Sequence, residues 1–220
     1  MMTRQMQFLN GWPRIYPILD SSFIPPAGRA EFLHKLASEL AEAGVMLLEY
    51  RNKTGGDVEM LSDAEILRRA MPAGQIKLIL DDRADLVEKI GFDGVHVDAG
   101  DSTPAEARRL LGPGRIIGTF GGSAALLPGI LAEPADYFSI GPVFPTRTKQ
   151  TSTPPIGMEG VRRLRAEAGA DPVLVAIGGI TLATATEAFS AGATVVAIAG
   201  ALFRQTDPAA EFRRWTAELR

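Results

Sequence analysis

Basic and acidic side chains recur directly after short apolar runs in this sequence. Arg51 and Lys53 follow one such run, Asp81 and Asp82 follow the next, and Asp101 comes after a third. Arginine and lysine bind phosphate oxygens, and carboxylates are among the ligands that Mg²⁺ prefers. If the ends of these runs meet in space, these residues indicate a site for an anionic substrate and a hard metal ion.

Small residues follow the last two apolar runs. Gly178 and Gly179 come after one of them, and Ala199 and Gly200 come after the other. Glycine lets the backbone approach a ligand closely, and the backbone N–H groups at a helix start bind anions. A glycine pair also occurs in ordinary turns, but glycines at both places together predict a site for one phosphate group.

Each of these polar residues also has a purely structural interpretation. Asp82 is suited to cap a helix with Asp85 in its first turn, and Asp101 is suited to an ordinary loop. Lys149 lies in a polar segment in which a lysine is commonly just solvated. His96 lies inside an apolar run, where a hydrogen-bonded core histidine is the favoured interpretation.

The elements that position these residues follow from an alternation along the whole chain. Short runs rich in Val, Ile and Leu are each followed by an amphipathic stretch, although Pro128 and Gly129 disrupt the fifth stretch. Near-continuous apolar runs are typical of parallel strands covered on both faces. Eight such repeats favour a (β/α)8 TIM barrel over an open doubly wound sheet, and in that barrel all strands end at one rim. The runs are 15–19, 45–50, 76–80, 94–97, 116–119, 137–140, 173–177 and 195–198.

Capping patterns predict where several helices begin. Ser62 with Glu65 and Thr103 with Glu106 both have the spacing of a capping box. Asp207, which precedes a proline, has the pattern of another helix start. These patterns therefore predict helix starts directly after Ser62, Thr103 and Asp207.

Composition limits the class of protein. The chain has 220 residues, of which 46% are hydrophobic and 22% charged, and its formal net charge of −3 offers no basic surface for nucleic acid or anionic lipid. The absence of cysteine and the presence of only two histidines exclude disulfides, thiolate catalysis and a multi-histidine metal site. No segment resembles a signal peptide or reaches the ~20 apolar residues of a membrane helix. We therefore expect one globular domain over residues 1–220, located in the cytoplasm, with assembly into a homo-oligomer left open.

Several motifs resemble one known family. The most specific is the run Gly141–Thr146 followed by Thr148 and Lys149, and the others are Glu49–Lys53, Asp81–Leu86, Gly94–Val97 and Ala176–Ile180. With these motifs, the chain resembles the thiamine-phosphate synthase family from about Tyr16 to Leu202. The resemblance implies a (β/α)8 barrel that joins hydroxymethylpyrimidine diphosphate to a thiazole phosphate, forming thiamine phosphate and releasing diphosphate.

The resemblance also implies roles for individual residues on the diphosphate side. Arg51, Lys53 and Lys149 would be the catalytic cations that hold the diphosphate. Asp82 and Asp101 would bind Mg²⁺, which bridges its oxygens. The positive charges would stabilise the negative charge that develops on the departing diphosphate, so no protein nucleophile is needed.

On the other side, the resemblance implies contacts with the second substrate. Thr146 and Thr148 would contact the thiazole, and Gly179, Ala199 and Gly200 would receive its phosphate.

Three further positions differ from the usual pattern of that family. Glu49 and Asp81, which would also contact substrate, stand where the family usually has Gln and Asn, and Phe120 stands where a small Ser is common. An amide donates hydrogen bonds to diphosphate, whereas an ionised carboxylate only accepts them. These differences leave room for a barrel that binds a phosphorylated metabolite without catalysis.

Two enzymatic alternatives also stay open. The related thiazole tautomerase uses a histidine soon after the fifth strand, but residues 119–123 contain none. A glycosidase would account for the carboxylates Glu49, Asp81 and Asp101, but not for the cations and the glycine loops beside them.

Overall fold

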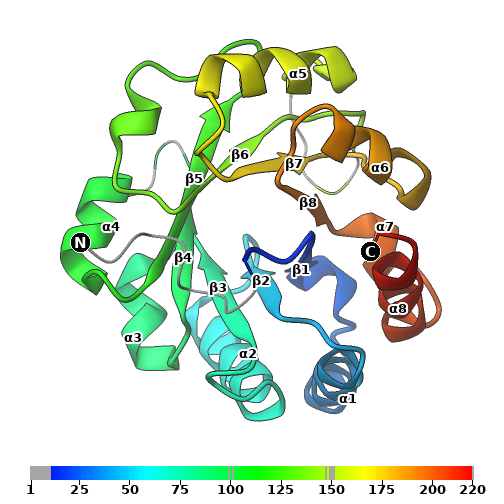
Figure 1. Cartoon of the computed structure of the whole chain (residues 1–220). Coiled ribbons are helices and arrows are strands. Elements are labelled where there is room, and N and C mark those ends of the chain that lie inside the picture. The colour runs from blue at the N-terminus through cyan, green and yellow to red at the C-terminus, as the bar shows by residue number, and fades with distance from the viewer. Residues whose placement is uncertain (1–10, 99, 101, 147, 149–151, 220) are drawn as a thin grey trace.

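Eight parallel strands form a closed barrel in chain order in the computed structural model, which describes residues 11–98, 100, 102–146, 148 and 152–219 (Figure 1). This arrangement confirms the predicted (β/α)8 TIM barrel. The strands are β1 (Ile15–Asp20), β2 (Leu47–Arg51), β3 (Lys77–Asp81), β4 (Gly94–Val97), β5 (Ile116–Gly122), β6 (Tyr137–Ile140), β7 (Leu174–Ile177) and β8 (Val195–Ile198).

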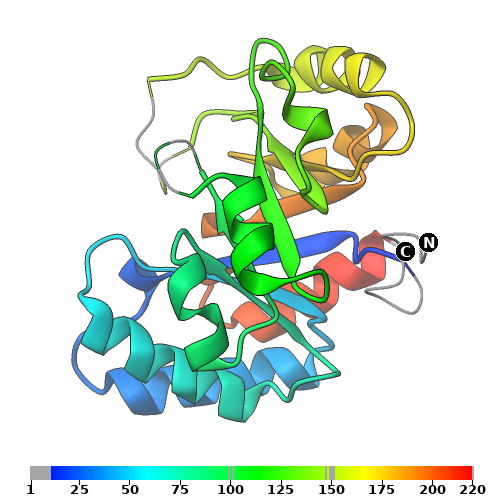
Figure 2. The ribbon, with the colours of Figure 1, turned by 90° about the vertical axis from the view of Figure 1, so that its left-hand side faces the viewer.

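Helices surround the barrel and cover its outer face (Figure 1). In the view of Figure 2, α1 and α2 lie on one side of the strands and α5 lies on the opposite side. The connection between β5 and β6 carries only the short 3₁₀ helix η4 (Ile130–Ala132), in agreement with the predicted weakness of this stretch. The α-helices are α1 (Arg29–Glu42), α2 (Asp57–Ala70), α3 (Val87–Ile90), α4 (Pro104–Leu111), α5 (Gly157–Ala168), α6 (Leu182–Ser190), α7 (Gly200–Phe203) and α8 (Pro208–Glu218), and η2 (Ser21–Phe23) and η3 (Ala84–Leu86) are further 3₁₀ helices.

Two of the three predicted helix starts are confirmed. Thr103 caps α4 through a complete capping box with Glu106, and the Asp207 side chain accepts a hydrogen bond from the first turn of α8. The prediction for Ser62 is wrong, because α2 begins at Asp57 and Ser62 lies inside it. An acidic residue at Asp57 favours an early start, since carboxylates in the first turn stabilise the helix dipole.

The buried residues form two separate apolar clusters. The larger one lies between the strands and the surrounding helices, and the smaller one fills the barrel interior with side chains such as Leu47, Ile79 and Val195. The interior cluster also contains Tyr16 and Tyr137, whose hydroxyl groups bring polar atoms to the barrel axis. The barrel interior is therefore packed with apolar side chains toward the amino ends of the strands and becomes polar toward their carboxyl ends.

No helix in the described ranges has the length and apolar character needed to cross a membrane.

Candidate active site

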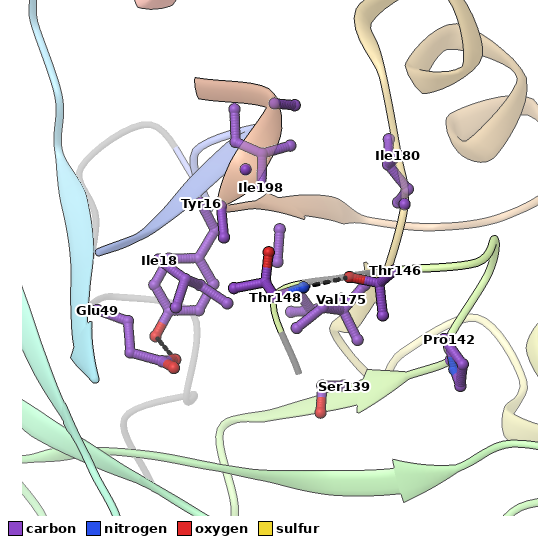
Figure 3. Close-up of a pocket in the computed structure, with 18 of the residues that line it drawn as sticks. Tyr16, Ile18, Glu49, Ser139, Pro142, Thr146, Thr148, Val175, Ile180 and Ile198 are labelled. Atoms are coloured by element: carbon purple, nitrogen blue, oxygen red, sulfur yellow. Dashed lines mark hydrogen bonds between the residues drawn. The ribbon is translucent and has the colours of Figure 1, made fainter. Parts of the chain in front are cut away.

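A cavity of about 600 Å³ opens at the carboxyl ends of the strands. Its wall includes Glu49 from β2, Asp81 from β3, Ser139 from β6 and Gly200, the first residue of α7 after β8. In Figure 3, side chains from distant parts of the chain point into this one space. The rim predicted from the strand ends is therefore hollow and large enough for a small-molecule substrate.

Two cations lie beside the cavity and are held by three carboxylates. Arg51 forms an ion pair with Asp20, and its Nε lies 3.4 Å from Asp81 Oδ2. Lys53 Nζ lies 3.1 Å from the same Asp81 oxygen and also contacts the Asp82 carboxylate. Because residues two apart on a strand point to the same side, the sequence places both cations on one face. The structure confirms that arrangement.

The two adjacent carboxylates contain oxygens without hydrogen bonds. Asp81 Oδ2 and Asp82 Oδ1 are buried and have no hydrogen-bond partner among the described residues, although the Asp81 oxygen is within ion-pair distance of both cations. Asp82 has a positive φ of 68°, which is uncommon outside glycine, and its N–H donates to the His96 carbonyl at 2.8 Å. Burial, followed by the charge of Asp82, raises the pKa of Asp81. The structure thus holds two carboxylates side by side at an energetic cost, as is common at functional sites.

A polar network behind the strand end supports these cations. Asp63 is 1% exposed and accepts hydrogen bonds from Arg29 Nη2 and from the Tyr50 hydroxyl, each at 2.5 Å. Asn52 Nδ2 donates to the Tyr50 oxygen at 3.1 Å, and Ser21 Oγ donates to Asn52 Oδ1 at 3.1 Å. The network therefore connects Asn52, the residue between the two cations, to η2, α1 and α2.

A chain of polar groups crosses the floor of the cavity. The Tyr16 hydroxyl donates to Glu49 Oε2 at 2.8 Å, as Figure 3 shows, and lies 2.9 Å from the Tyr137 hydroxyl. The Tyr137 oxygen lies 3.1 Å from His96 Nδ1, and His96 Nε2 lies 3.5 Å from Asp98 Oδ1. Buried polar groups are stable only when they are paired, so this chain forms a connected unit.

Gly118 leaves space for the ring of Tyr137 in this hydrogen-bonded chain. A Cβ atom built on Gly118 of β5 would lie 1.9 Å from Tyr137 Cζ and 2.3 Å from its hydroxyl oxygen. Any larger residue at Gly118 would therefore displace the ring of Tyr137 from the position in which it contacts Tyr16 and His96.

Burial and mutual contacts shift the pKa values of the polar groups on the cavity floor. Burial raises the pKa of Glu49 to about 7; the charge of His96 opposes this shift and that of Asp81 adds to it. For His96, burial lowers the pKa, but the hydrogen bond to Asp98 and the charge of Glu49 outweigh it and raise the pKa to about 9. Burial raises the pKa of Tyr16 well above its ordinary value, so its hydroxyl stays a neutral donor. On the cavity floor, Glu49 therefore titrates near neutral pH and His96 at mildly basic pH.

The opposite side of the cavity is built from glycines. Gly178 and Gly179 have positive φ angles of 98° and 65°. A Cβ on Gly179 would lie 2.5 Å from the Pro145 carbonyl oxygen and 2.7 Å from Phe144 Cβ. The pair therefore lets the loop after β7 contact the loop after β6, in addition to its predicted role at a phosphate.

A threonine and an arginine lie next to the other predicted phosphate loop. A Cβ on Gly200 would lie 3.0 Å from Arg204 Nε and 3.3 Å from Thr148 Oγ1. Thr148 N–H donates to Thr146 Oγ1 at 3.3 Å, a bond drawn in Figure 3. The Arg204 guanidinium carbon lies 5.6 Å from the centre of the Phe23 ring. Hydroxyl and guanidinium groups thus border Gly200, which has no side chain to fill the space between them.

Most of the predicted site residues meet in this cavity. Lys53 and Asp82 adjoin it through Asp81, whereas Lys149 and Asp101 lie outside the described residues, so their roles stay predictions. The predicted residues that line the cavity are Glu49, Arg51, Asp81, Thr146, Thr148, Gly179, Ala199 and Gly200.

Other lining residues were missed by sequence reasoning. His96 is buried and hydrogen-bonded as predicted, but it also lines the cavity, as do Tyr16, Tyr137, Asp98 and Arg204. The available signal was a hydroxyl or imidazole inside an apolar run, because such a group needs a polar partner when it is buried.

Comparison with known proteins gives a consistent result. The family model described as thiamine monophosphate synthase matches residues 15–202. A thiamine-phosphate synthase of Koribacter versatilis is 40% identical over 186 residues, which cover 84% of this chain and 87% of the relative. One from Agrobacterium fabrum is 37% identical over 194 residues, which cover 87% of this chain and 86% of the relative.

A solved structure is similar as well. The thiamine phosphate pyrophosphorylase from Pyrococcus furiosus superimposes with a TM-score of 0.75 at 25% identity, covering 94% of this chain and 95% of the other. The matched region contains all eight strands and the loops that line the cavity. The chain therefore belongs to the thiamine monophosphate synthase family.

Proposed function

We propose that this chain is a transferase that condenses hydroxymethylpyrimidine diphosphate with thiazole phosphate to give thiamine phosphate and diphosphate. The observation that carries the proposal is that one cavity has two different sides, each suited to bind an anion. Paired cations and carboxylates lie at the ends of β2 and β3, and glycine loops follow β7 and β8. Two phosphorylated substrates bound from opposite sides would bring their rings together between them.

Arg51 and Lys53 would act on the departing diphosphate. When the bond between the pyrimidine methylene carbon and the diphosphate breaks, negative charge accumulates on the leaving oxygen. Cations already held in place stabilise that charge without having to reorganise. The ion pairs to Asp20, Asp81 and Asp82 supply this preorganisation.

The carboxylates suit a magnesium ion. Asp82, together with Asp101 as the family resemblance implies, would hold Mg²⁺, and the buried Asp82 Oδ1 without a hydrogen-bond partner fits such a role. Mg²⁺ is usually bound through one or two carboxylates, substrate phosphate oxygens and water. When bound, the ion supplies positive charge to the diphosphate oxygens. Oxygens of the bound diphosphate would complete the coordination of the ion.

The glycine side would bind and orient the thiazole phosphate. Thr146 and Thr148 present hydroxyl groups, and Gly179 and Gly200 leave the backbone accessible to phosphate oxygens. Holding the thiazole nitrogen against the methylene carbon increases the rate by proximity alone.

The first experiment is a direct assay of both products. Purified protein would be incubated with both substrates, with Mg²⁺ or with a chelator, and thiamine phosphate and diphosphate would be quantified. We expect both products in equal amounts, with formation that depends on Mg²⁺. Folded protein that binds thiazole phosphate but forms no product would exclude the transferase and favour a non-catalytic phosphometabolite-binding barrel.

A further inference from the structure

The position of Glu49 on its strand determines which part of the substrate it faces. Glu49 precedes Arg51 by two residues on β2, so both side chains point to the same side. Such residues are about 6.5 to 7 Å apart along a strand. In the proposed function the pyrimidine methylene is bonded to the diphosphate that Arg51 holds. The ring would therefore lie one step deeper, next to Glu49.

The two oxygens of Glu49 are in different situations. Oε2 accepts the hydrogen bond from Tyr16, whereas Oε1 has no hydrogen-bond partner among the described residues. The residue itself is 3% exposed, yet it lines the cavity. A carboxyl group at this place is available to a ligand and is otherwise shielded from water.

The pyrimidine of thiamine has an amino group beside a ring nitrogen, so this edge offers a donor next to an acceptor. A protonated carboxyl group has the matching pair, an O–H donor and a carbonyl acceptor, as does the amide of the Gln that the family usually has. An ionised carboxylate lacks the donor. A carboxylate paired with a ring protonated at that nitrogen makes the same two bonds and contains the same number of protons.

We propose that Glu49 binds the aminopyrimidine edge through a two-point contact that always holds one proton, so that binding of this substrate is linked to proton uptake. This inference rests on the proposed function. What it adds to the substrate contact already expected for Glu49 is the linked proton, which explains how a carboxyl group can replace an amide there.

The groups around Glu49 determine the pH range in which substrate binding is linked to proton uptake. They are Tyr16 from β1, Arg51 from β2 itself, Asp81 from β3, His96 from β4, Asp98 after β4, and Tyr137 from β6. Burial raises the pKa of Glu49 to about 7, and a charged His96 lowers it. Above about pH 7 the free protein loses the proton that the contact needs, so affinity falls as pH rises.

The test measures binding without turnover. The probe is the free aminopyrimidine alcohol, because it has no phosphate groups that titrate in the same range. Its dissociation constant would be measured by calorimetry between about pH 7 and 9, in buffers of different ionisation enthalpy, which report proton uptake directly. For wild-type protein we expect proton uptake and a dissociation constant that rises by up to about tenfold per pH unit.

Two variants make the result specific. Glu49→Gln keeps a donor and an acceptor but has no titrating proton, so we expect binding without proton uptake and without the pH dependence. His96→Gln removes a positive charge that favours the ionised form of Glu49, so the pH at which affinity begins to fall should move upward. Because His96 does not contact the ligand in this proposal, a purely structural loss would weaken binding at every pH instead.

The outcomes separate this inference from the proposed function. A wild-type affinity that does not change with pH, or a pH dependence that persists in Glu49→Gln, would overturn the role of Glu49 even if thiamine phosphate is formed. Proton-linked binding without product formation would support the role of Glu49 and contradict the transferase.

Discussion

The two sides of the cavity are suited to anions by different means. At the ends of β2 and β3, Arg51 and Lys53 are paired with carboxylates before any substrate arrives. After β7 and β8, Gly179 and Gly200 keep side chains away from the backbone, and Thr148 adds a hydroxyl. The first side depends on charge and the second on shape. We call them the charged side and the glycine side.

This difference predicts which kinetic constant each side controls. Charge that develops only as diphosphate departs is stabilised in the transition state, so the charged side should mainly affect kcat. A phosphate that does not react is bound equally before and during the reaction, so the glycine side should mainly affect KM. Substitutions on each side can test this separation.

The largest effect is expected for Arg51→Ala. Losing one preorganised donor to developing charge commonly lowers kcat by about 10²- to 10³-fold. Steady-state kinetics with both substrates would measure the loss, and thermal unfolding would report whether removing the ion pairs with Asp20 and Asp81 destabilises the fold. Arg51→Lys, which retains the charge, should recover part of kcat. An increase in KM with unchanged kcat would contradict the prediction that the charged side acts mainly on the transition state.

A smaller effect is expected for Gly179→Ala. An added Cβ would be strained at a φ of 65° and would press on Phe144 and Pro145. We expect KM for thiazole phosphate to rise by about tenfold, which corresponds to about 1.4 kcal/mol, with little change in kcat. The matched control is Gly169→Ala, since Gly169 also has a positive φ, of 79°, but a Cβ there would meet nothing within 4 Å.

That pair of variants separates local strain from loss of the loop contact. Both should destabilise the fold by about 1 kcal/mol or more through backbone strain. Only Gly179→Ala should alter KM. Equal effects on KM would mean that the glycine side has no special shape requirement.

The last prediction concerns the pH dependence of stability. Folding raises the pKa of Glu49 from its ordinary 4.5 to about 7 and that of His96 from 6.5 to about 9. The folded chain thus binds more protons than the unfolded chain between these limits, and the free energy of unfolding should fall as pH rises from about 5 to 9. Each extra proton contributes a slope of at most about 1.4 kcal/mol per pH unit.

Urea unfolding at several pH values would measure this slope. Glu49→Gln should remove the slope between about pH 5 and 7, whereas Thr148→Ala on the glycine side should leave the slope unchanged. A slope that is equal in both variants would show that the floor of the cavity does not control it.

Most of the barrel was predictable because a strand covered on both faces reads as a continuous apolar run. The strands Gly94–Val97, Tyr137–Ile140 and Val195–Ile198 have the same bounds in the sequence prediction and in the structure. The helix start at Ser62 was wrong because a capping pattern is local and also occurs inside helices. Sequence spacing alone does not determine which of two competing starts is used.

The site was predictable where it depends on strand ends and not where it depends on closure of the barrel. Arg51 and Asp81 are the last residues of their strands, so the fold class alone places them together. Tyr16 and Tyr137 are 121 residues apart and lie within apolar runs. Their hydroxyl groups meet only because β1 and β6 face each other across the closed barrel.

The empty position at Gly118 also has an evolutionary consequence. Because a Cβ there would overlap the Tyr137 ring, Gly118 cannot gain a side chain while Tyr137 keeps its position. Relatives with a larger residue at the position of Gly118 should have a smaller side chain opposite it, and they would lose the link between Tyr16 and His96 at the same step. A substitution of Gly118 should therefore be accompanied by one of Tyr137 in the same lineage, and such lineages would lack the hydrogen-bonded chain across the cavity floor.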